Sequence, residues 1–440
     1  MHPLILRNLS PSSYREVNQL DWLPSAEAIQ PFFATLNEDT ALLGNLKNLT
    51  QIIQNSTKGT LSYLSTALLL NKLSLHISTQ RADGRSVAFL LNPNNPLPGD
   101  FLNTRAQPDM ISRLFTSDEL EGYIEQLMNA RQAKPKRIPK LGTLRPAWGE
   151  TLAPLELKTR EYRKDKICNY LDINKIYRVD LSYILGFAGR QSGFDLFTLS
   201  PSIMQRSKGS YPWNDFVTLL RYIVGLYKCY ETRDPNIEFL PIASQAWMCK
   251  IDDRNHLVFP FIATHGPGRS TWVATGFDLE DNTSVIVKVS WVDMTVPEDE
   301  GKMYTLLGEL PGLMHLRKFW KATNVDTVKG GVIERRKCYL VTDSIGLPLS
   351  KCRSVSEFLS VMDQLCQVID EMHNRGVFHR DISWYNVMLD KTGTISSSIL
   401  SAGTAVSSTA TASGLSTQEK ARDESKESME FISDLHAGKS

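Results

Sequence analysis

The stretch "GVFHRDISWYN", residues 376–386, places a His-Arg-Asp triplet directly after a predicted helix. An asparagine, Asn386, follows five residues after the aspartate of the triplet, Asp381. An aspartate can accept a proton from a reacting hydroxyl, and an asparagine oxygen can bind a hard metal ion. The triplet also fits a surface loop without chemistry, so the rest of the sequence has to decide between these interpretations.

The composition predicts a folded protein with more than one domain. The chain has 440 residues, of which 42% are hydrophobic and 22% charged, and its formal net charge is +1. This balance gives no electrostatic sign of a nucleic acid or membrane partner. Six cysteines without a C-x-x-C pair argue against a zinc site or a disulfide framework. We therefore expect an intracellular protein with reduced thiols and no membrane-spanning segment.

Hydrophobic periodicity outlines the local structure on both sides of this stretch. It predicts short helices over residues 1–80, longer helices at 117–132, 214–230 and 356–376, a hairpin within 176–200, three strands within 256–291 and a buried strand from 338. The resulting organisation is α+β, with a mixed α/β domain over 1–250 and a second domain over 255–440.

A glycine turn lies between the first two strands of the second domain. In "GPGRSTWV" (266–273), Gly266, Gly268 and Val273 occupy positions of the pattern G-x-G-x-x-G-x-V, while Thr271 replaces the third glycine. Glycines allow backbone amides to approach phosphate oxygens closely. The turn is therefore a candidate phosphate cover, and a plain hairpin is the alternative.

The next strand carries a lysine in an apolar run. Lys288 lies in "VIVKVSW" (285–291), where a buried charge requires a partner. Glu300 is the preferred partner because it precedes Met303 and Leu307 at helical spacing. Glu298 and Glu309 are the alternatives.

The buried strand from 338 then leads into the polar link "TDSIGLPLS". A link of this kind is typical of a hinge between two lobes. We expect Thr342 to flank the inner pocket, and the backbone of Asp343 and Ile345 to form hydrogen bonds with adenine. Asp381 would accept the proton of the attacking hydroxyl, and Asn386 would bind magnesium.

Three stretches together, "GVFHRDISWYNVML", "VIVKVSW" and "YLVTDSIGLPL", resemble the fungal-type protein kinase domain family. The resemblance is strongest over residues 255–390. It implies a bilobal protein-kinase-like fold with a five-stranded N-terminal lobe, ATP and Mg²⁺ as cofactors, and transfer of the γ-phosphate to a Ser/Thr hydroxyl of an unknown protein. Lys288, Glu300, Arg380 and Asp381 would then be the catalytic residues.

The sequence departs from this pattern after Asn386. A Ser/Thr-rich insert at about 391–430 is expected to be disordered, because it has few large apolar side chains. The candidate second metal ligand, Asp434 in "FISDLH", follows the insert, although this segment can equally belong to the insert itself. The chain ends at Ser440 before an A-P-E motif, which predicts an incomplete C-terminal lobe and weak activity.

A second hypothesis concerns the first domain. Pro108 and Asp109 are followed at a distance by Glu156 and Lys158, a pattern that resembles the PD-(D/E)xK nuclease-like fold. There, two acids on adjacent strands bind a divalent metal and the lysine positions a water molecule. This alternative implies a magnesium-dependent nuclease with nucleic acid as its partner, or a related domain that serves only as an interaction module.

Overall fold

The computed structural model describes residues 14–56, 59–92, 109–133, 150–157, 179–240, 246–263, 270–295, 300–326, 334–343, 346–378, 387–389 and 395–396. These residues form two compact units that divide between Pro235 and Asn236. We call them the N-terminal unit and the C-terminal unit. The division falls before the predicted boundary at residue 250, because residues 237–239 and 247–251 form two short strands that pair with the second sheet.

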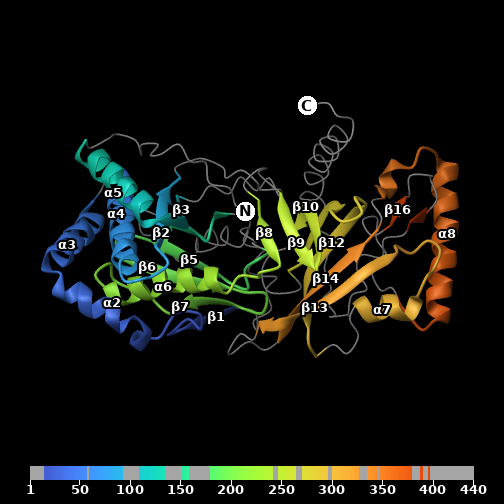
Figure 1. Ribbon diagram of the computed structural model, residues 1–440, viewed down its shortest axis with the longest axis horizontal. Coiled ribbons are helices and arrows are strands. Elements are labelled where there is room, and N and C mark those ends of the chain that lie inside the picture. The colour runs from blue at the N-terminus through green and yellow to red at the C-terminus, as the bar shows by residue number, and fades with distance from the viewer. Residues whose placement is uncertain are drawn as a thin grey trace. The chain divides into compact units, whose positions relative to one another are not determined.

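The N-terminal unit combines a mixed sheet with helices (Figure 1). The strands follow the order β1-β7-β6-β5-β4-β3-β2, and the outer pair β1 and β7 as well as the inner pair β4 and β5 run parallel. Its elements are β1 (Tyr14–Val17), α2 (Ala26–Glu38), α3 (Thr40–Asn55), α4 (Gly59–Ser78), β2 (Arg85–Leu91), β3 (Met110–Thr116), α5 (Ser117–Gln132), β4 (Ala153–Leu157), β5 (Ile184–Gly189), β6 (Phe194–Leu199), β7 (Met204–Ser207) and α6 (Phe216–Glu231).

The helix α4 is anchored to the sheet by one buried amide. Asn71 donates to the carbonyl of Phe89 at 2.9 Å and accepts from its N–H at 2.8 Å, so one side chain completes both backbone groups of a β2 residue. Leu68, Leu70 and Leu73 of the same helix are buried around it. Burial on most sides allows α4 to extend over 20 residues, longer than the short helices predicted for this region.

The C-terminal unit is built on one seven-stranded antiparallel sheet with the order β13-β14-β12-β11-β10-β9-β8 (Figure 1). Five of these strands, β10 to β14, lie in the region predicted as the second domain, which is the number expected, and β8 and β9 extend the sheet beyond β10. Its elements are β8 (Ile237–Phe239), β9 (Trp247–Ile251), β10 (Arg254–Ala263), β11 (Trp272–Asp278), β12 (Ser284–Asp293), α7 (Glu300–Leu307), β13 (Leu316–Asp326), β14 (Arg335–Thr342), β15 (Leu347–Pro348), α8 (Val355–Asn374), β16 (Met388–Leu389) and β17 (Ile395–Ser396).

The part of this unit that follows β14 contains α8 and the small sheet β15-β16-β17. Ser354 caps α8 by accepting the N–H of Glu357, and Gly376 ends the segment with a positive φ of 79°. The two residues of β17 fall at the start of the predicted Ser/Thr-rich insert, whose remaining residues lie outside the described ranges. Over the ranges given above, no helix has both the length and the apolarity needed to cross a bilayer.

Candidate functional site

Lys288 lies in the middle of β12, between two other strands of the C-terminal sheet. In the strand register it is opposite Val273 on β11 and opposite Leu340 on β14. Residues paired in this way point to the same face of a sheet. The Lys288 side chain is 6% exposed, which makes a compensating charge necessary.

The compensating charge comes from the first residue of α7. The Nζ atom of Lys288 lies 3.0 Å from Oε1 and 2.7 Å from Oε2 of Glu300, so the ammonium contacts both carboxylate oxygens. Glu300 is 13% exposed, and the pair is therefore largely shielded from water. Of the three candidate acids named from the sequence, the structure thus brings Glu300 to Lys288. The catalytic role of the pair remains a prediction.

The wall beside this ion pair is apolar and contains one buried hydroxyl. Val273, Ile286 and Met314 form a small cluster of buried side chains. Thr342, which is opposite Ile286 in the register of β12 and β14, is fully buried. Its Oγ1 atom has no hydrogen-bond partner among the described residues. The hydroxyls of Thr275 and Tyr304 in the same unit also have no hydrogen-bond partner among the described residues, so this feature is not specific to Thr342.

Asp343 follows β14, at the start of the predicted hinge. Its N–H donates to the carbonyl of His315 at 3.2 Å, in continuation of the β13–β14 ladder. The backbone of Asp343 can therefore contribute its carbonyl, rather than its amide, to an adenine base. Ile345, the other residue expected to contact adenine, lies outside the described residues.

With this geometry established, the comparison with known families is informative. Residues 314–435 match the family model described as fungal protein kinase. Over this segment the chain is similar to fungal protein kinases. The kinase-family segment includes β13, β14, α8 and the His-Arg-Asp stretch, whereas Lys288 and Glu300 precede it. No curated protein shows a significant sequence match to the chain.

Several predicted site residues cannot be placed. The residues Gly266, Gly268, Ile345, Arg380, Asp381, Asn386 and Asp434 lie outside the described ranges. The described residues on either side of the glycine pattern are paired, since Ala263 at the end of β10 is opposite Trp272 at the start of β11. The role of the glycines stays a prediction.

The residues of the nuclease-like pattern lie in the N-terminal unit. Asp109 directly precedes β3, and its Oδ2 atom accepts the N–H of Leu157 on the adjacent strand β4 at 2.8 Å. Glu156 is therefore on the strand next to Asp109, whereas Pro108 and Lys158 lie outside the described residues. Within the described part of the chain, no group of three or more His, Cys, Asp or Glu side chains is arranged to hold a metal ion.

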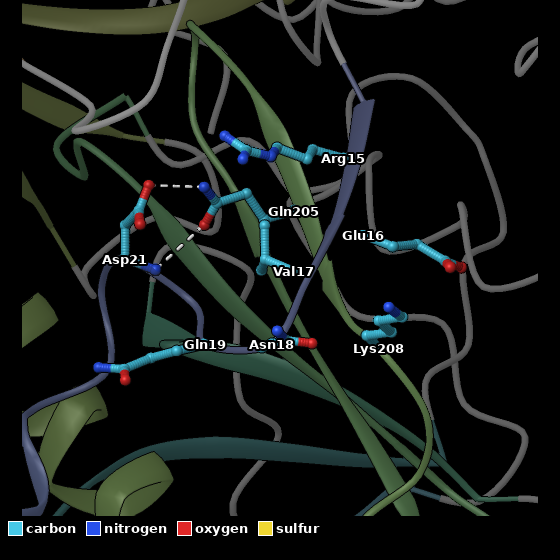
Figure 2. Close-up of a pocket in the computed structure, with 8 residues that line it drawn as sticks. All are labelled: Arg15, Glu16, Val17, Asn18, Gln19, Asp21, Gln205 and Lys208. Atoms are coloured by element: carbon cyan, nitrogen blue, oxygen red, sulfur yellow. Dashed lines mark hydrogen bonds between the residues drawn. The ribbon is translucent and has the colours of Figure 1, made fainter.

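The same unit contains an open hollow of about 510 Å³ between β1, β7 and the loop that follows β1. Figure 2 shows Gln205 at its centre, with the side chain turned toward Asp21. The Gln205 amide donates to Asp21 Oδ2 at 2.6 Å and accepts from the Asp21 N–H at 3.1 Å. None of the residues that line the hollow belongs to a motif found in the sequence.

Proposed function

We propose that the C-terminal unit binds ATP and transfers its γ-phosphate to a Ser/Thr hydroxyl of a protein, within a bilobal protein-kinase-like fold. The observation that carries this proposal is the buried Lys288–Glu300 ion pair, formed on the strand that follows the glycine-turn hairpin. A strand lysine held by a helix glutamate is the arrangement that protein kinases use to position ATP phosphates. The match of residues 314–435 to the fungal protein kinase family supports the same assignment.

Each of the site residues would have a role in binding one nucleotide. Lys288 would contact its phosphates, Val273 and the cluster around Ile286 would cover the base, and Thr342 and Asp343 would flank its edge. Asp381 would accept the proton of the attacking hydroxyl, which Arg380 would help to position. Asn386 and Asp434 would bind Mg²⁺, whose contribution when bound is to offset charge on the phosphates. An intracellular location is part of this proposal, since ATP is supplied there.

Thermal unfolding with and without ATP and Mg²⁺ tests the binding step. At 100 times its Kd, a ligand stabilises the folded state by about 2.7 kcal/mol, which gives a measurable rise in Tm. Lys288→Met should abolish the rise. The control variant is Lys250→Met, which removes a half-exposed lysine from β9 of the same sheet and should keep the rise. An equal rise in the wild type and Lys288→Met would overturn the assignment.

Phosphoryl transfer needs its own assay. With radiolabelled ATP and a generic protein substrate, label transfer by the wild-type chain should be weak, and Asp381→Asn should lower any transfer that is measured, by up to about 100-fold. Equal label transfer by the wild type and by Asp381→Asn would contradict the proposed role of Asp381. ATP binding without any transfer would limit the function to nucleotide binding.

A second candidate function is a magnesium-dependent nuclease in the N-terminal unit. The hydrogen bond from Leu157 to Asp109 favours it, because this bond brings the predicted aspartate next to the strand that carries Glu156. Asp109→Asn keeps an oxygen for the Leu157 N–H but removes the negative charge required for metal binding. Cleavage of DNA or RNA that is lost in Asp109→Asn and unchanged in Lys288→Met would support this function. Absence of cleavage by the wild type would exclude it.

A further inference from the structure

An ion-pair network in the C-terminal unit joins the ends of several strands. Its centre is Asp278, at the end of β11, which is only 1% exposed. The Nε atom of Arg254 donates to Asp278 Oδ2 at 2.7 Å, and Nη1 of Arg317 lies 3.5 Å from the same oxygen. A buried carboxylate is costly without such partners. Arg317 is therefore held on one side by a buried anion.

Arg317 also reaches the residue that follows β14. Its Nε atom forms an ion pair with Oδ1 of Asp343, while Nδ1 of His315 lies 2.7 Å from Oδ2 of the same carboxylate. The Asp343 amide is bonded to the His315 carbonyl, as described above. Residues at the start of β13 thus hold Asp343 at both carboxylate oxygens and at its backbone amide.

We propose that Arg317 is a positioning residue for base recognition, which fixes Asp343 so that its main-chain carbonyl accepts a hydrogen bond from the 6-amino group of a purine nucleotide. This rests on the proposed function, in which adenine binds at the predicted hinge. The Asp343 amide already donates to the His315 carbonyl. The Asp343 carbonyl is therefore the backbone group that would form a hydrogen bond with the base. A carbonyl acceptor favours a 6-aminopurine and repels a 6-oxopurine, which presents an acceptor at the same position.

The geometry predicts a specific effect of removing Arg317 on nucleotide binding. A guanidinium is a rigid fork that can contact several acids at once, and here it joins Asp278 and Asp281, which lies 3.3 Å from Nη1, to the partly exposed Asp343. Without Arg317, the Asp343 backbone has one anchor fewer, and its carbonyl direction is less well defined. The contact of Lys288 with the phosphates does not depend on Arg317. Loss of Arg317 should therefore lower the selectivity between bases rather than the affinity for every nucleotide triphosphate.

The experiment compares ATP with inosine triphosphate, which carries a carbonyl in place of the 6-amino group. Kd values are measured by titration calorimetry in Mg²⁺ for the wild type, Arg317→Ala and Arg317→Lys. The wild type should prefer ATP, and Arg317→Ala should reduce the ratio of the two Kd values by about three- to tenfold, the equivalent of one hydrogen bond. Arg317→Lys keeps a charge but not the fork, so its ratio should be intermediate.

A second variant removes the same anchor without touching the buried acid. Asp343 is 33% exposed, so Asp343→Ala should fold even where Arg317→Ala does not. If Arg317 acts through Asp343, the double variant should lose no more selectivity than either single variant. Additive losses, or an unchanged ratio in both single variants, would overturn the positioning role alone. A wild type without Lys288-dependent ATP binding would overturn the proposed function and this inference together.

Discussion

Gly301 and Phe319 are packed so closely that a Cβ atom on the glycine would lie 2.1 Å from Cδ1 of the phenylalanine ring. Gly301 follows Glu300 in α7, and Phe319 is on β13. The helix can approach the sheet this closely only because residue 301 has no side chain. This approach places Glu300 within reach of Lys288.

Gly301→Ala should therefore destabilise the protein, although alanine is the better helix former. We expect a loss of about 1–3 kcal/mol in the free energy of unfolding, from displacement of α7 or of the Phe319 ring. Urea unfolding measures it. Gly122→Ala in α5 is the matched control, since its Cβ would meet nothing within 4 Å, and it should stabilise by about 0.5–1 kcal/mol. Stabilisation by both substitutions would contradict the packing argument.

The Lys288–Glu300 pair should show strong energetic coupling. Glu300→Gln leaves the nearly buried Lys288 ammonium facing a neutral amide, which should cost about 1–3 kcal/mol. Adding Lys288→Met removes that charge, so the two effects should not add. A double-mutant cycle for the exposed pair Lys250–Asp253, 3.1 Å apart, should give less than about 1 kcal/mol and serves as the reference. Similar coupling energies in both cycles would count against a special role of the buried pair.

His256 should make the C-terminal unit sensitive to mild acid. Burial lowers the pKa of His256 from its ordinary value of 6.5, while its Nδ1 lies 3.2 Å from the carbonyl of Cys249. Above pH 6.5 the imidazole is neutral in both states. Below that value the unfolded chain takes up a proton more readily than the folded chain, so stability falls as pH falls.

Urea unfolding at pH 7.5 and 5.0 measures this difference. In His256→Asn the stability loss between the two pH values should be smaller than in the wild type. His373→Asn, which removes an exposed imidazole on α8, should leave the difference unchanged. An identical pH dependence of the wild type and His256→Asn would refute the assignment.

Asp195 should be the most sensitive charged position of the N-terminal unit. It is fully buried, forms ion pairs with Arg190 and Arg206, and accepts the hydroxyl of Ser210 at 2.6 Å. Asp195→Asn removes the buried anion that both poorly exposed guanidinium groups contact, at a cost of about 3–5 kcal/mol. Glu16→Gln removes the charge of an exposed residue 3.6 Å from Arg206 and should cost less than about 1 kcal/mol by urea unfolding. An equal loss in the free energy of unfolding of both variants would show that the buried ion pairs of Asp195 stabilise the protein no more than the exposed contact of Glu16.

Elements with local sequence signals could be predicted without the structure. The helix predicted at 117–132 begins and ends at these residues, because Thr116 and Glu119 form a capping box three residues apart. The helix expected near 214 is capped by Asp215, and the hairpin predicted around residues 190–193 is formed by β5 and β6. Lys288 was likewise evident, since a charge in an apolar strand stands out without any tertiary information.

Contacts between distant segments could not be predicted from the sequence. Whether Glu300 or another acid contacts Lys288 depends on how closely α7 packs on β13, and therefore on Gly301 and Phe319. The pairing of β12 with β14, and the contacts of Arg317 with Asp278 and Asp343, join residues far apart in the chain. Strand pairing and ion pairs of this kind carry no periodic signal, because their energy arises only once the sheet has brought the partners together.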